Sequence, residues 1–143
     1  MDPLLQFIFG MTLAIILHEL THLLTILYYK IPFKAIVLTK WSAVGFLVDN
    51  ESYVSDNKKL VFLYFSPLIW SLVYFINPNE PFFLMFPIVN IFGGIGDFYS
   101  FFKLIVIPPE KRIELANNSD EKVLKKIIWR KDISLKSKAV NGK

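Results

Sequence analysis

The residues best suited to chemistry are His18-Glu19-Leu20-Thr21-His22, an H-E-x-x-H pattern. Residues four apart lie on the same face of an α-helix, so both imidazoles can bind one metal ion. The glutamate between them lies beside that face, where its carboxylate can take a proton from a metal-activated water. We expect one Zn2+ ion per chain, because zinc favours nitrogen and oxygen ligands and a catalytic site keeps one tetrahedral position open for water.

The surroundings of this pattern favour a functional interpretation. The chain has two histidines, and both lie in a long apolar stretch. A shuffled chain of this composition would contain the pattern with a chance of about one in a thousand. Ionisable residues at membrane depth are costly unless they are paired or coordinated. The alternative, two histidines that hydrogen-bond to neighbouring helices, leaves Glu19 without a role. The chain has no cysteine, which excludes thiolate metal sites and disulfides.

Asp97 is the candidate for the third metal ligand, since it is the other acid inside an apolar stretch. His18 lies 14 residues after Leu4, and Asp97 lies 15 residues after Phe82. At 1.5 Å per helical residue, both positions are about 21–22 Å from the same membrane face. An acid at a helix end near the interface is the alternative interpretation. If Asp97 is not the ligand, Glu80 and Asp49 are more distant candidates.

Asn90 and the glycine-rich run Gly93–Gly96 precede this aspartate. The Asn90 amide could hold a substrate backbone or stabilise an oxyanion, and a helix–helix hydrogen bond is an equal alternative. The glycines could allow close helix packing, or they could let the helix unwind and bring Asp97 to the first span.

The elements that must position these residues are long apolar stretches. Hydrophobic residues make up 54% of the 143 residues and charged residues 20%, with a mean hydropathy of +0.46. This composition excludes a disordered chain, a collagen and a coiled coil. Three stretches approach the roughly 20 residues that a membrane-spanning helix needs. We therefore predict an all-α membrane protein with transmembrane helices at 3–29, 60–76 and 82–107, the second interrupted at Ser66-Pro67.

The distribution of Lys and Arg predicts the orientation. Five of the sixteen lie between positions 30 and 59, and the other eleven lie from Lys103 onward. By the positive-inside rule, the N-terminus and the 77–81 turn are outside, and the 30–59 loop and the C-terminal tail are cytoplasmic.

Two further elements are predicted on the cytoplasmic side. The β-rich runs 35–39 and 43–48 predict a small β-hairpin, with an irregular loop as the alternative. After a membrane core of residues 1–109, residues 110–143 form a basic tail. Asn118 and Glu121 predict the start of an amphipathic helix on the anionic inner leaflet, with a solvated helix packed on the hairpin as the alternative. We do not expect nucleic-acid binding.

With these motifs, residues 4–107 resemble the site-2 protease group of intramembrane zinc metalloproteases, and more closely the small putative zincin peptidases related to them. The resemblance implies that His18, His22 and Asp97 bind zinc. It also implies that Glu19 is the catalytic base and that Asn90 helps to hold the substrate. In the site-2 proteases a glycine usually follows the aspartate, whereas here Gly96 precedes it.

The prediction is therefore a zinc-dependent intramembrane endopeptidase that hydrolyses a peptide bond of a membrane-spanning protein or peptide in the lipid bilayer. The exposed edge of the hairpin could take up a substrate strand. The main alternative is a non-catalytic membrane metal-binding or transport protein with the same ligands. It would need a fourth protein ligand or a polar path to both faces. A scaffold subunit with an inactive site is a third possibility.

Overall fold

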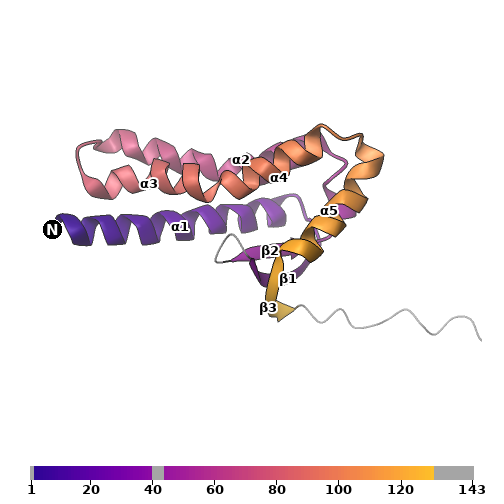
Figure 1. The fold of residues 1–143 in the computed structure, drawn as a ribbon. Coiled ribbons are helices and arrows are strands. Elements are labelled where there is room, and N and C mark those ends of the chain that lie inside the picture. Colours follow the sequence, from indigo (N-terminus) through magenta and orange to yellow (C-terminus); the bar gives the residue numbers. More distant parts are fainter. Residues whose placement is uncertain (1, 40–43, 131–143) are drawn as a thin grey trace, which may run out of the picture.

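The computed structural model describes residues 2–39 and 44–130 and is mostly helical (Figure 1). A long helix lies beside a second layer of shorter helices, and a small sheet lies at the end away from the N-terminus. The helices are α1 (Pro3–Tyr28), η1 (Asn50–Ser52), α2 (Asn57–Phe65), η2 (Ser66–Ile76), α3 (Pro81–Gly93), α4 (Ile95–Ile105) and α5 (Pro109–Val123). The strands are β1 (Phe33–Thr39), β2 (Gly45–Val48) and β3 (Leu124–Arg130).

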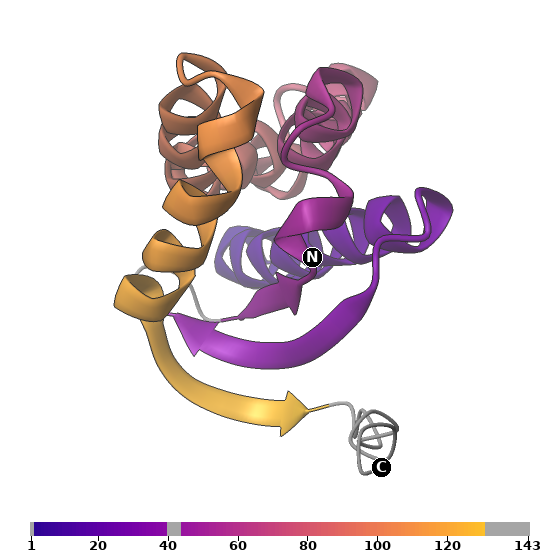
Figure 2. The same cartoon turned by 90° about the vertical axis from the view of Figure 1, so that its right-hand side faces the viewer.

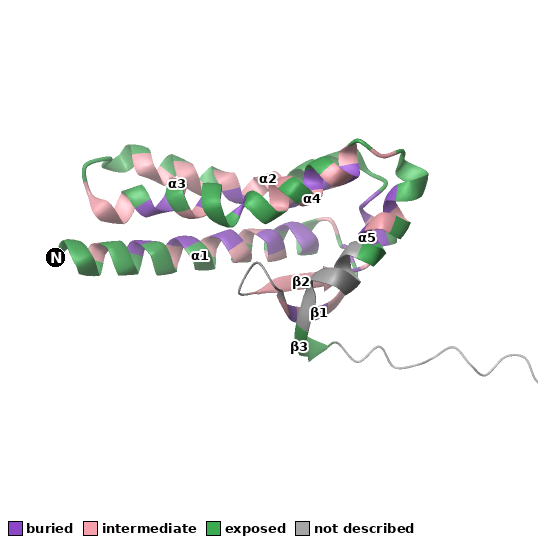
Figure 3. Cartoon of the chain, viewed as in Figure 1, coloured by how far each residue is buried: buried purple, intermediate pink, exposed green. Residues whose placement is uncertain are grey.

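The apolar helices agree with the stretches predicted at 3–29, 60–76 and 82–107. By length and composition, Pro3–Tyr28 and Asn57–Ile76 could each cross a membrane, and α3 with α4 gives a third candidate if the bent pair is one span. Figure 3 shows exposed residues along these helices, and they include the large apolar residues Leu5, Phe75 and Phe92. Helix α1 begins sharply because the Asp2 carboxylate accepts hydrogen bonds from the backbone of Leu4 and Leu5.

The predicted interruption at Ser66-Pro67 is present as a change of helix type. Helix α2 ends at Phe65, and the 3-10 helix η2 begins at Ser66. Proline has no backbone N–H, so residue 67 cannot donate to the carbonyl of Leu63 one turn earlier.

The glycine-rich run bends the third apolar segment. Helices α3 and α4 meet at an angle of 40° with Gly94 between them. A Cβ atom on Gly94 would lie 2.5 Å from the Asn90 carbonyl oxygen, so a larger residue does not fit. A Cβ on Gly96 would meet nothing within 4 Å. Of the two interpretations of the glycines, the structure supports the broken helix, which places Asp97 in the first turn of α4.

The predicted β-hairpin is confirmed, and it is part of a larger sheet. Strands β1 and β2 are antiparallel, and β3 pairs antiparallel with the other edge of β1. Position 43, in the predicted second run, lies outside the described residues. Figure 2 shows this sheet and α5 at the end of the helical layer.

The prediction of an amphipathic helix that starts at Asn118 is wrong. Helix α5 starts earlier, at Pro109, and residues 124–130 form strand β3. The apolar residues from Val123 to Ile128 also fit a short strand, and helical spacing over so few residues does not distinguish the two. Pairing with β1 gives the segment backbone partners, and the Trp129 ring stacks on Phe33 with centroids 5.8 Å apart.

Helix α5 packs on the helical layer through Arg112, which is 4% exposed. Its guanidinium donates hydrogen bonds to the Ile107 carbonyl at 2.7 Å and to the Asn57 side-chain oxygen at 2.6 Å. It also donates to the carbonyls of Ile105 and Val54. This arginine, counted from the sequence among the basic residues of the tail, ties α5 to the end of α4 and the start of α2.

Candidate metal centre

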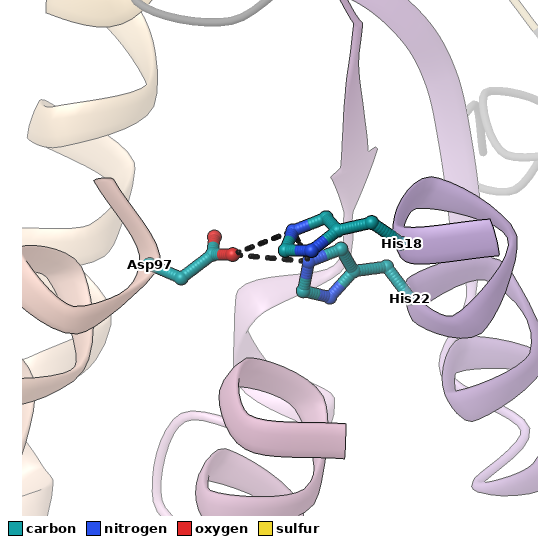
Figure 4. Close-up of side chains that lie close together, drawn as sticks. All are labelled: His18, His22 and Asp97. Atoms are coloured by element: carbon teal, nitrogen blue, oxygen red, sulfur yellow. Dashed lines mark hydrogen bonds and ion pairs between the residues drawn. The ribbon is translucent and has the colours of Figure 1, made fainter. Parts of the chain in front are cut away.

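Three side chains from two distant segments converge (Figure 4). His18 and His22 project from α1, and Asp97 projects from the start of α4. The Asp97 Oδ2 atom lies 3.3 Å from His18 Nε2 and 3.1 Å from His22 Nε2, and the two Nε2 atoms are 3.3 Å apart. The structure therefore brings together the three residues that the sequence indicated as metal ligands.

The other ring nitrogen of each histidine faces an oxygen atom. His22 Nδ1 lies 2.7 Å from the backbone carbonyl of Leu63, and His18 Nδ1 lies 2.9 Å from the side-chain oxygen of Asn90. A carbonyl oxygen only accepts hydrogen bonds, so each Nδ1 carries the proton in this arrangement. A neutral ring then presents an unprotonated Nε2 toward Asp97.

This donor set fits a bound cation. Two imidazole lone pairs and a carboxylate oxygen repel one another at these distances unless positive charge lies between them. A tetrahedral zinc ion with bonds of about 2.0–2.1 Å places its ligand atoms about 3.3–3.4 Å apart. The observed separations of 3.1, 3.3 and 3.3 Å are close to that spacing. The cluster comprises three ligand groups among the described residues, which leaves one position of a tetrahedral shell.

Asn90 is fully buried, and both ends of its amide are engaged. The oxygen accepts from His18, and the nitrogen donates to Ser71 Oγ at 3.2 Å. The Ser71 hydroxyl can accept this hydrogen bond, so it is compatible with the amide oxygen facing the ring. This is a contact between helices, as in the second alternative weighed for Asn90. A role in holding substrate or an oxyanion stays a prediction.

Glu19 lies next to His18 on α1 and is partly exposed. It is near enough to His18, His22 and Asp97 to interact with them electrostatically. Its role as the catalytic base stays a prediction.

The two more distant candidate ligands lie elsewhere. Glu80 is the N-cap residue of α3. Asp49 forms an ion pair with Lys34 at 3.0 Å and accepts a hydrogen bond from Ser52 at 2.6 Å.

Two groups in the site were not predicted from the sequence. One is the Leu63 carbonyl, and the other is the Ser71 hydroxyl. A backbone acceptor has no side-chain signature, but Pro67 four residues after Leu63 was a signal that this carbonyl lacks its helical partner. Ser71 carried no such signal.

Comparison with known proteins gives a family match. Residues 11–111 match a family described as "Putative zincin peptidase". No curated protein matches the chain, and no solved structure matches it. The matched segment contains the three clustered side chains together with Glu19 and Asn90.

Proposed function

The chain belongs to the putative zincin peptidase family, and we propose from that premise that it is a zinc-dependent endopeptidase that cleaves substrates within a membrane. The observation that carries the zinc assignment is the convergence of His18, His22 and Asp97 at distances that suit one tetrahedral ion. The supporting observation for catalysis is that three protein ligands leave a position for water or substrate.

The exposed surface supports the membrane setting. Leu5 is 57% exposed and Phe75 is 74% exposed, and both lie on helices long and apolar enough to span a bilayer. Water-soluble monomers rarely expose large contiguous apolar patches. Lipid tails would cover these side chains without cost, and the helices satisfy their own backbone hydrogen bonds.

Each residue of the site has a role in the proposed reaction. His18, His22 and Asp97 would hold the metal. When bound, zinc polarises a carbonyl group and makes a water acidic enough to lose its proton near neutral pH. Glu19 takes a proton from the attacking water and later delivers it to the leaving amine. A helical substrate must unwind locally, because its carbonyls are otherwise engaged in the helix. In the proposed orientation, the N-terminus lies outside and the sheet lies in the cytoplasm.

A reconstituted assay tests this function. The purified chain in lipid vesicles, together with a transmembrane reporter peptide, should cleave the peptide. Removal of zinc with a chelator should stop cleavage, and added zinc should restore it. Cleavage of soluble peptides alone would contradict the intramembrane substrate. Stoichiometric zinc without cleavage of either substrate would favour the non-catalytic metal-binding alternative.

A further inference from the structure

We propose that Pro67 is a positioning residue for His22, because it leaves the Leu63 carbonyl free to bind the imidazole. The consequence for metal binding rests on the proposed function, whereas the consequence for the ring itself does not.

Position 67 lacks the backbone donor that a continuous helix would have there. In a continuous α-helix, the carbonyl of residue 63 accepts a hydrogen bond from the N–H of residue 67. Residue 67 is proline, which has no N–H, and the helix changes type at this point. Leu63 is 7% exposed, so water has little access to that carbonyl.

His22 supplies the replacement donor. Its Nδ1 atom lies 2.7 Å from the Leu63 oxygen, a short contact for an N–H···O hydrogen bond. The bond links α1 to α2 and satisfies a carbonyl that would otherwise be buried without a partner. The proline and the histidine are therefore complementary: one removes the local donor and the other supplies a distant one.

This hydrogen bond determines what the other ring nitrogen does. In a neutral ring with the proton on Nδ1, the His22 Nε2 lone pair points toward Asp97 at 3.1 Å. A hydrogen bond at the second nitrogen fixes both the tautomer and the orientation of a ligating histidine. An alanine at position 67 would bring an N–H that competes with His22 for the same carbonyl.

Pro87 provides a matched control. It lies inside α3, and the carbonyl one turn earlier belongs to Phe83. In the described part of the chain, neither site histidine bonds to that carbonyl. Pro87→Ala is therefore the same chemical change within a helix, without the proposed link to a ligand.

The test is nitrogen NMR of the full chain labelled with 15N-histidine and kept free of metal. The two histidines give four ring nitrogens, and a His18→Gln variant assigns them. The experiment compares the His22 signals in the wild type, in Pro67→Ala and in Pro87→Ala. We expect a protonated Nδ1 in the wild type and in Pro87→Ala, and loss of that single tautomer in Pro67→Ala. Zinc affinity, measured by competition with a chelator, should fall about 10–100-fold in Pro67→Ala and stay unchanged in Pro87→Ala.

Other outcomes overturn either the proposal or the zinc assignment. Wild-type His22 signals in Pro67→Ala would show that the proline does not control the ring. Altered signals with unchanged zinc affinity would remove the positioning role. If Pro67→Ala does not fold, the wild-type spectrum decides, because an unprotonated His22 Nδ1 contradicts the hydrogen bond to Leu63. A wild type that binds no zinc would end the zinc assignment, while the ring signals would still test Pro67.

Discussion

At the scale of single residues, the site is defined by what each imidazole nitrogen faces. Both Nδ1 atoms face oxygen acceptors, Asn90 for His18 and the Leu63 carbonyl for His22. Both Nε2 atoms face Asp97. Such outer contacts raise the basicity of ligating histidines and hold them in place before the metal arrives.

The Glu19→Gln variant tests whether Glu19 is the catalytic base. The variant should bind zinc as the wild type does but lose at least about 100-fold of its cleavage rate, since general base catalysis contributes about 10²–10⁴-fold. Zinc content and cleavage of the transmembrane reporter are measured together. The exposed Glu51, on η1, gives the control substitution Glu51→Gln, which should retain full activity. A Glu19→Gln protein that cleaves at the wild-type rate would exclude Glu19 as the base.

The convergence of the three clustered side chains could be predicted from the sequence, but the groups that contact their outer atoms could not. His18 and His22 were identified by their spacing, and Asp97 by its depth in an apolar stretch. The Leu63 carbonyl became an acceptor only because α1 and α2 pack together at that point. Sequence spacing carries no information about which backbone group a distant ring will meet.

At the scale of elements, the bend between α3 and α4 positions Asp97, the proposed third ligand. Gly94 allows the bend, because a Cβ there would lie 2.5 Å from the Asn90 carbonyl. A Cβ at position 94 would also displace the backbone of Asn90, whose side chain contacts His18.

Gly94→Ala should therefore move Asp97 away from the histidines and weaken zinc binding by at least about tenfold, as loss of a supporting contact does. Gly96→Ala is the control, since its Cβ would meet nothing within 4 Å. Chelator competition measures both affinities. Equal zinc affinity in the two variants would show that the bend does not position the ligand.

The elements differ in how well the sequence predicted them. The long apolar helices were predicted because they are uninterrupted over many turns. The hairpin was predicted because β-branched and aromatic residues cluster in the runs 35–39 and 43–48. Strand β3 was mistaken for a helix, because its identity depends on pairing with β1, which lies almost ninety residues earlier in the chain.

At the scale of the whole molecule, Arg112 joins α5 to the helical layer. Its replacement by alanine would leave the Ile105 and Ile107 carbonyls and the Asn57 oxygen without this donor. Each buried polar group left unpaired costs about 1–3 kcal/mol. Arg112→Ala should therefore lower the thermal unfolding temperature in detergent clearly, whereas Lys111→Ala, at an exposed position, should not. An unchanged unfolding temperature in Arg112→Ala would contradict this role.

The orientation of the molecule is testable because the chain has no cysteine. The N-terminus and the turn before α3 lie at one end of the helical layer, and the sheet and α5 lie at the other (Figure 1). Lys34, Lys58 and Lys59 lie in the segment that follows α1, where Figure 1 shows the sheet and the start of α2. This arrangement supports the predicted orientation, with the sheet in the cytoplasm.

Single cysteines at two exposed positions test the orientation of the chain in the membrane. Asn79→Cys, in the turn before α3, should react with a membrane-impermeant maleimide on intact cells. Ser55→Cys, just before α2, should react only after the membrane is opened. The reverse pattern would contradict the orientation, and reaction of both on intact cells would contradict the spanning arrangement.

The most direct test of the central claim is the zinc content of the purified protein. We predict one zinc ion per chain in the wild type, and loss of that ion in both His22→Ala and Asp97→Ala. The Glu51→Gln control should keep its zinc. A wild type without stoichiometric zinc, or an Asp97→Ala protein that binds zinc as tightly as the wild type, would contradict a site built from two imidazoles of α1 and one carboxylate of α4.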